Sequence, residues 1–66
     1  MQNNLRKYRE SLQMTQEDLA RLTGVSRQSI ISIEKGQYVP STVLALKFAS
    51  ALHTLVEDLF YLEKGD

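Results

Sequence analysis

Residues 16–37 read QEDLARLTGVSRQSIISIEKGQ and hold two short amphipathic segments joined by the turn Gly24-Val25-Ser26. A turn this short suits two helices that cross at about 90–120° rather than two that lie antiparallel. Such a crossing needs a small residue where the backbones approach, and Ala20 provides it. Ile30 and Ile33 supply the buried face of the second segment. The stretch therefore predicts a helix-turn-helix.

Hydroxyl side chains mark where helices begin, because a Ser or Thr at the N-cap accepts a hydrogen bond from a first-turn N–H. Thr15 with Asp18 three residues on is an N-cap pattern with a first-turn acid, and Thr54 with Glu57 has the spacing of a capping box. Ser26 and Ser41 offer N-caps for two more helices. The pattern predicts five helices and no strong strand, with helices over residues 4–13, 16–23, 27–35, 42–52 and 55–60. The tail 61–66 is expected either to fray or to add a short strand to a partner.

The chain has 66 residues, no cysteine and one histidine. This length predicts a single domain over residues 1–66, which buries only about 60% of the surface that its unfolded chain exposes. Domains of this size usually need disulfides, a metal or a partner chain for stability. The composition excludes disulfides and thiolate metal sites, and one histidine cannot build a metal site. We therefore expect no metal and no cofactor, and dimerisation as the support.

Eight Lys and Arg residues balance eight Asp and Glu residues, so the net charge is zero. A neutral chain is not expected to act as a generic polyanion-binding tail or as a basic peptide at membranes. The charge is nevertheless uneven, since residues 1–36 carry six cations against four anions and residues 37–66 carry two against four. The half with the predicted helix-turn-helix is therefore mildly basic.

No run of residues approaches the roughly 20 apolar positions of a transmembrane helix. The first ten residues lack the apolar segment of a signal peptide. With the absence of cysteine, these features predict a cytoplasmic protein without a membrane partner. No Ser/His/Asp set, phosphate loop or pair of acids in a pocket is evident, so we do not expect an enzyme.

The stretch 16–37 resembles the helix-turn-helix of the phage repressor and Cro-type (XRE-like) regulators. The matching positions combine several chemistries at fixed offsets: Gln16, Ala20, Gly24, Val25, Ile30, Ile33 and Glu34. The likeness extends over about residues 4–60. It implies an all-α, compact five-helix, lambda-repressor-like DNA-binding domain. Its second and third helices would form the helix-turn-helix over residues 16–35.

The resemblance places the third helix in the major groove of double-stranded DNA, with its N-terminal residues at the base edges. An Arg there can donate two hydrogen bonds to guanine, and a Gln can bond adenine with the same geometry. The implied base contacts are Ser26, Arg27, Gln28, Ile31 and Ser32. The alternatives are that Ser26 only caps its own helix and that the others are ordinary surface residues.

The implied phosphate contacts flank that helix and comprise Gln16, Ser29, Lys35, Gln37 and Tyr38. Gln16 matches the family's phosphate-contacting glutamine at a helix N-terminus, where free N–H groups favour anions. The alternative for each is an ordinary polar surface position. The family also pairs an Arg of the first helix with the Glu that ends the third. This match implies an ion pair between Arg9 and Glu34.

The C-terminal part carries more apolar residues than a monomer of this size can cover. In the helix over residues 42–52, the face expected to be buried consists of Ala45, Phe48, Ala49 and Leu52. The apolar residues left over on that helix are Val43, Leu44 and Leu46. We expect residues 53–66 to supply a homodimer interface formed by Leu55, Leu59, Phe60, Tyr61 and Leu62. The alternative is a monomer whose last helix packs on its own core.

These observations predict a sequence-specific transcriptional regulator, and more narrowly a repressor that binds a palindromic operator as a homodimer. The chain has no room for a ligand-sensing domain, so control would come from its concentration, the operator layout or a second regulatory protein. One alternative is an antitoxin-like or adaptor protein that acts mainly through a protein partner. Another is a small helical interaction module that does not touch DNA.

Overall fold

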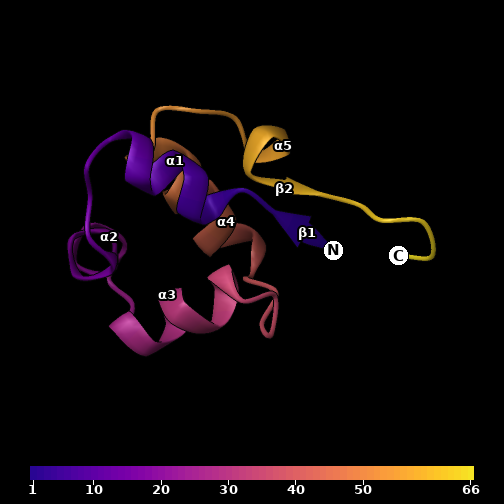
Figure 1. Ribbon diagram of the computed structural model, residues 1–66, viewed down its shortest axis with the longest axis horizontal. Coiled ribbons are helices and arrows are strands. Elements are labelled where there is room, and N and C mark those ends of the chain that lie inside the picture. The colour runs from indigo at the N-terminus through magenta and orange to yellow at the C-terminus, as the bar shows by residue number, and fades with distance from the viewer.

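Five helices surround one core, and a two-stranded sheet joins the two ends of the chain (Figure 1). The computed structural model describes residues 1–66. The elements in chain order are β1 (Gln2–Asn3), α1 (Leu5–Ser11), α2 (Gln16–Thr23), α3 (Arg27–Glu34), α4 (Thr42–Ala51), α5 (Val56–Leu59) and β2 (Phe60–Tyr61). None of the helices has the length and apolar character needed to span a bilayer.

Side-chain caps fix the starts of α2, α3 and α4, as the sequence predicts. Thr15 Oγ1 accepts the Asp18 N–H at 3.0 Å, and the Asp18 carboxylate accepts the Thr15 N–H at 2.9 Å. This bond from the Thr15 backbone holds the pKa of Asp18 below its usual range. Ser26 and Ser41 cap α3 and α4 through their hydroxyl oxygens. The capping chemistry is therefore local and readable from the sequence.

The predicted start of the last helix is wrong. Leu55 is the N-cap of α5, and no side chain caps this helix. Thr54 Oγ1 instead donates to the Asp58 carboxylate at 3.0 Å, so Thr54 and Glu57 form no capping box. Without that cap, α5 is a single turn, shorter than the predicted 55–60.

Helices α1 and α4 end slightly earlier than predicted because a left-handed residue follows each. Gln13 has a φ of 58° and His53 a φ of 55°. A residue in this conformation ends an α-helix, and glycine usually occupies the position. Because neither residue is glycine, the sequence gives no signal for these two stops.

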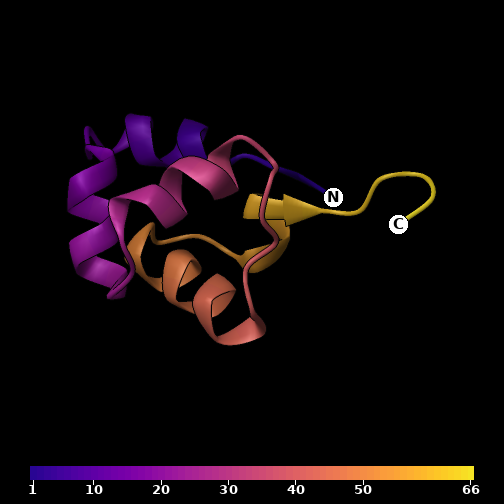
Figure 2. The same ribbon diagram turned by 90° about the horizontal axis from the view of Figure 1, so that it is seen from below.

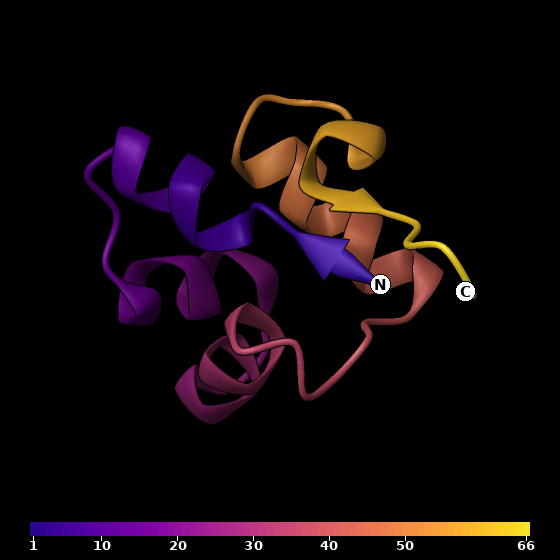
Figure 3. The same cartoon turned by 45° about the vertical axis from the view of Figure 1, so that its right-hand side comes forward.

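The structure contains a small sheet that the sequence does not predict. β1 and β2 pair antiparallel, with Gln2 opposite Tyr61 and Asn3 opposite Phe60. The Asn4 N–H extends the pairing by donating to the Leu59 carbonyl at 2.7 Å. Figure 3 shows the two strands side by side. The C-terminal strand thus pairs within its own chain, and the residues after it reach beyond the helical body (Figure 2).

Eleven buried apolar residues form the core, and α4 with its C-cap contributes four of them: Leu44, Phe48, Ala49 and the C-cap Leu52. The predicted burial of Phe48, Ala49 and Leu52 is confirmed, whereas Ala45 is only half-buried. Leu44 is buried and is not excess surface, which corrects the prediction. The inner face of α4 is therefore rotated slightly from the expected one.

Two residues predicted to form the dimer interface, Leu59 and Phe60, are buried instead, which corrects that part of the prediction. Leu59 is 0% exposed and Phe60 is 8% exposed, so both lie in the chain's own core. The β1–β2 pairing holds them there, and the Phe60 ring lies 6.3 Å from the Phe48 ring at a tilt of 37°. This edge-tilted arrangement is favourable for two aromatic rings.

Candidate nucleic-acid interface

The turn between α2 and α3 sets how α3 is presented. Gly24 ends α2 with a φ of 75°, a left-handed conformation that glycine adopts without a steric penalty. Its N–H bonds to the Ala20 carbonyl at 2.9 Å. Val25 is half-buried and packs against the core, and Ser26 then starts α3. In Figure 1 α2 is seen end-on while α3 runs across the view, so the two helices cross steeply.

Two isoleucines fix the rotation of α3. Ile30 and Ile33 are both 0% exposed, so they point into the core. Successive residues of a helix are separated by about 100° around its axis. The side of α3 opposite the core therefore holds four of the predicted DNA contacts: Gln28, Ile31, Ser32 and Lys35. The first and last of these are exposed, and the middle two are half-buried outside the core.

Arg27 lies on the flank of α3 that faces α1 and the start of α2. A polar cleft of about 640 Å³ opens there, and no apolar residue lines it. Its lining residues are Arg6, Arg9, Thr15, Gln16, Glu17, Arg27 and Glu34. Arg6 is not among the residues predicted to contact DNA. Its signal is the three-residue spacing from Arg9, which puts both on one face of α1.

The implied ion pair between Arg9 and Glu34 is present in this polar cleft and is nearly buried. Arg9 Nε donates to Glu34 Oε2 at 2.6 Å, and Arg9 Nη2 donates to Glu34 Oε1 at 3.1 Å. The two side chains are only 9% and 6% exposed. The hydrogen bond to Glu34 raises the pKa of Arg9, so its guanidinium stays charged. This two-pronged contact ties α1 to the end of α3.

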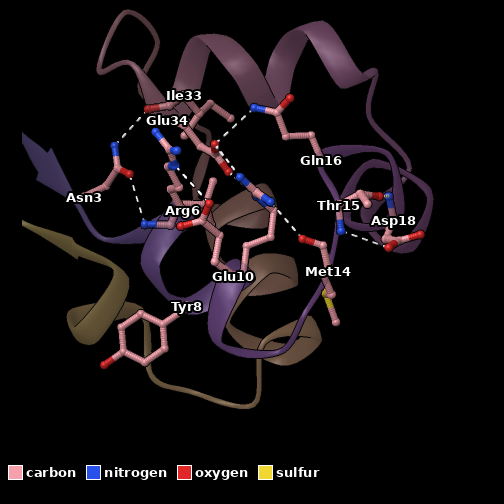
Figure 4. Close-up of polar contacts among 12 residues, drawn as sticks. Asn3, Arg6, Tyr8, Glu10, Met14, Thr15, Gln16, Asp18, Ile33 and Glu34 are labelled. Carbon is pink, nitrogen blue, oxygen red and sulfur yellow. Dashed lines mark hydrogen bonds and ion pairs between the residues drawn. The ribbon is translucent and has the colours of Figure 1, made fainter.

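Gln16 extends the pair into a cluster of three side chains. Its Nε2 donates to Glu34 Oε1 at 3.2 Å, as Figure 4 shows. A third hydrogen bond runs from Arg9 Nη1 to the Met14 carbonyl at 2.8 Å. The Gln16 side chain is therefore held at the N-terminus of α2, where the first backbone N–H groups have no helical partner. The Asp18 N–H is bonded to Thr15 and the glutamine amide to Glu34, so the N–H groups of Gln16 and Glu17 are the ones left at this helix end.

The other flank of α3 borders a neutral hollow. It is lined by Ser26, Gln28, Ser29, Ser32, Gln37 and Tyr38, none of which is charged. The hollow brings predicted base contacts together with three of the predicted phosphate contacts. Ser26 Oγ already accepts the Ser29 N–H at 3.1 Å and lies 3.1 Å from Ser29 Oγ. Of the predicted base contacts, Ser26 is thus the one whose side chain is already engaged.

Ion pairs neutralise half of the cations in the basic half of the chain. The three pairs are Arg9–Glu34, Arg6–Glu10 at 3.2 Å and Arg21–Asp18 at 2.6 Å. Lys7, Arg27 and Lys35 make no ion pair. Two of these three unpaired cations belong to α3 or its C-cap. Within residues 1–36, most of the unpaired positive charge therefore lies at this helix.

A separate apolar surface lies at the C-terminal side of the molecule. Of the predicted interface residues, Leu55, Tyr61 and Leu62 are exposed, the last by 76%. Val43 and Leu46, which the sequence left over on the outer side of α4, are also exposed. We call these five exposed apolar residues of α4 and the C-terminal part the apolar face. Two of them, Leu46 and Leu62, line a shared groove of about 390 Å³, together with Met1, Pro40, Val56 and Phe60. No cluster of three or more His, Cys, Asp or Glu side chains is placed to hold a metal ion.

Known proteins are similar to this chain in sequence and in fold. A helix-turn-helix family model matches residues 5–59. An uncharacterised HTH-type transcriptional regulator of Methanocaldococcus jannaschii is 52% identical over 66 residues, which cover all of both chains. The uncharacterised HTH-type transcriptional regulator YgzD of Bacillus subtilis is 44% identical, with 97% of each chain covered.

Solved structures of other regulators have a similar fold. The crystal structure of the restriction-modification controller protein C.AhdI from Aeromonas hydrophila superposes with a TM-score of 0.79, at 39% identity and 85% coverage of each chain. The clp gene regulator ClgR from Corynebacterium glutamicum gives a TM-score of 0.78 at 30% identity, and the match covers 82% of this chain and 57% of that one. These proteins are regulators, not enzymes. The chain belongs to the XRE or Cro/C1-type family of helix-turn-helix transcriptional regulators.

Proposed function

We propose that this regulator is a repressor that binds a palindromic operator as a homodimer, with α3 in the major groove. The observation that carries the proposal is the rotation of α3, in which two buried isoleucines leave Arg27 and Gln28 exposed in the first turn. Arg suits guanine and Gln suits adenine through paired hydrogen bonds. The side chains proposed to contact phosphates are Gln16 in the polar cleft, Ser29, Gln37 and Tyr38 in the neutral hollow, and Lys35 at the end of α3.

Arg27→Ala and Gln28→Ala are each expected to weaken operator binding by about 1–3 kcal/mol and to relax the preference at one base pair. Titrating the variants against duplexes that differ at single positions measures both effects. Arg21→Ala is the matched control, because Arg21 lies on α2, is exposed and pairs with Asp18. It removes the same charge at a site away from α3. Unchanged binding of both α3 variants to every duplex would mean that this helix does not read bases.

The homodimer is proposed to form through the apolar face. In helices of single domains one side is usually polar, whereas α4 carries apolar residues on its outer side as well as its buried side. A two-fold contact would place Leu46 and Leu62 of one protomer near the same residues of its partner. Such a dimer presents two copies of α3 to half-sites about 34 Å apart. The groove gives the contact a concave surface to fill.

Leu46→Glu is expected to convert the dimer to a monomer, because it places a charge in the apolar face without disturbing the core. Sedimentation at micromolar concentration measures the change. Leu22→Glu is the matched control, since Leu22 is similarly exposed but lies on α2. The control should remain dimeric. If the unmodified protein itself sediments as a monomer, the homodimer is wrong, and a different protein partner is favoured for this face.

A further inference from the structure

Asn3 contacts both α3 and the strand that leads to the apolar face. Its backbone lies in β1, opposite Phe60 of β2. Its side-chain Nδ2 donates to the Ile33 carbonyl, in the last turn of α3, at 2.9 Å. Its Oδ1 accepts the Leu5 N–H at 3.1 Å, and Figure 4 shows both bonds. One amide side chain thus connects the sheet, the start of α1 and the end of α3.

The two bonds leave this amide little freedom. The Leu5 N–H can only donate and the Ile33 carbonyl can only accept, so one orientation of the amide makes both bonds. The contact is half-buried, which strengthens it relative to a solvated one. The Ile33 carbonyl also accepts the Gly36 N–H at 2.9 Å, so Asn3 holds the C-terminal end of α3.

The sheet continues this connection to the proposed dimer interface. β2 ends at Tyr61, and Tyr61 and Leu62 both belong to the apolar face. A path of direct contacts therefore runs from α3 through Asn3, β1 and β2 to that face. The Arg9–Glu34 pair also holds α3, but it connects the helix to α1 and not to the strands. Asn3 is the link between the surface that would read DNA and the surface that would bind the second copy.

We propose that Asn3 is a positioning residue that fixes the spacing between the two α3 helices of the dimer. This inference rests on the dimeric function proposed above. Two linked readers gain affinity only if their geometry lets both engage at once. Without the Asn3 bond, α3 still reads one half-site, but its end can shift relative to the partner protomer. The dimer then discriminates less sharply between operators that differ in half-site separation.

Asn3→Asp is the variant that tests the link, because it removes the Nδ2 donor and keeps the Oδ1 acceptor and the shape. Asn4→Asp is the matched control. Asn4 Nδ2 also donates to a backbone carbonyl, that of Asp58 at 3.1 Å, but this bond reaches α5 and not α3. Both variants add one negative charge at neighbouring positions. Any difference between them therefore reports the contact with α3.

The measurement is the affinity of each dimer for the operator, for a single half-site, and for operators with one base pair added or removed between half-sites. We expect Asn3→Asp to lower the spacing discrimination at least fivefold and the operator affinity about tenfold, with half-site affinity within twofold of the unmodified protein. Asn4→Asp should keep the discrimination. Equal discrimination by the two variants would overturn the proposal, and so would an equal loss on half-site and operator.

Amide hydrogen exchange in the free protein supplies a second readout that needs no DNA. The Lys35 and Gly36 amides, at the end of α3, should exchange at least fivefold faster in Asn3→Asp than in Asn4→Asp. Equal exchange rates would overturn the positioning role. Failure of the function proposed above has a different signature: the unmodified protein would bind a single half-site as tightly as the full operator, at any spacing.

Discussion

Arg9→Ala is expected to lower the free energy of unfolding by about 3–5 kcal/mol, because it leaves the Glu34 carboxylate buried without its cation. The Glu34 side chain is 6% exposed, and its remaining partner is the neutral Gln16 amide at 3.2 Å. A single neutral donor does not replace a guanidinium that makes two hydrogen bonds. Urea unfolding followed by circular dichroism, at one fixed protein concentration, measures the loss.

Arg6→Ala is the control for this prediction. Arg6 also pairs with a glutamate, Glu10 at 3.2 Å, but its side chain is 71% exposed. Exposed pairs of this kind contribute about 0–1 kcal/mol. The double variant Arg9→Met/Glu34→Met should recover much of the stability, since it removes both buried charges together. Equal urea midpoints for Arg9→Ala and Arg6→Ala would show that the buried pair does not stabilise the fold.

Phe48→Ala is expected to cost about 3–5 kcal/mol, which is as large as the loss of the ion pair. Phe48 is 0% exposed, and its ring packs 6.3 Å from the ring of Phe60. The truncation leaves a cavity between α4 and β2 in addition to removing apolar contacts. In a chain of 66 residues such a loss is a large part of the total stability. The variant should also loosen β2, because Phe60 loses its aromatic neighbour.

Lys47→Ala is the control on the same helix, because Lys47 is exposed and lies outside the apolar face. It should change the unfolding free energy by less than about 0.5 kcal/mol. Phe48→Leu should recover a substantial part of the loss by refilling the cavity. Thermal unfolding of the three variants measures the differences. If Phe48→Ala and Lys47→Ala unfold at the same temperature, the core is not organised around this ring.

The features that the sequence predicted correctly have local causes. The N-caps at Thr15, Ser26 and Ser41 depend on hydroxyl groups that bond to a backbone N–H three residues later. Short sequence motifs therefore predict where α2, α3 and α4 begin. The stop of α2 at Gly24 is equally local. Ile30 and Ile33 gave the rotation of α3 because helical spacing alone determines which side they share.

The features that could not be predicted depend on contacts between distant residues. A strand of two residues has no detectable alternation, so β1 and β2 leave no pattern in the sequence. Because this pairing was not predicted, Leu59 and Phe60 were expected at the dimer surface, whereas they lie in the core. The left-handed conformation of His53 could not be predicted, because the residue that usually signals it, glycine, is absent at this position.

Contacts between distant residues also shaped the nucleic-acid interface in ways that the sequence did not indicate. The resemblance to the family implied the Arg9–Glu34 pair, yet nothing in the sequence indicated that Gln16 would bond to the same carboxylate. The contact of Asn3 with the Ile33 carbonyl spans 30 positions and depends on the whole fold. Arg6 was overlooked as a lining residue of the polar cleft because its role depends on where α2 and α3 lie.

The claim that the protein reads a palindrome through α3 is tested most directly by selecting binding sites from a pool of random duplexes. The account predicts one enriched site with two inverted half-sites whose centres lie about one helical turn apart. It also predicts that Arg27→Ala and Gln28→Ala each lose selection at one position in both half-sites. Enrichment of no sequence, or of an asymmetric site whose preferences are unaffected by both variants, would contradict the account.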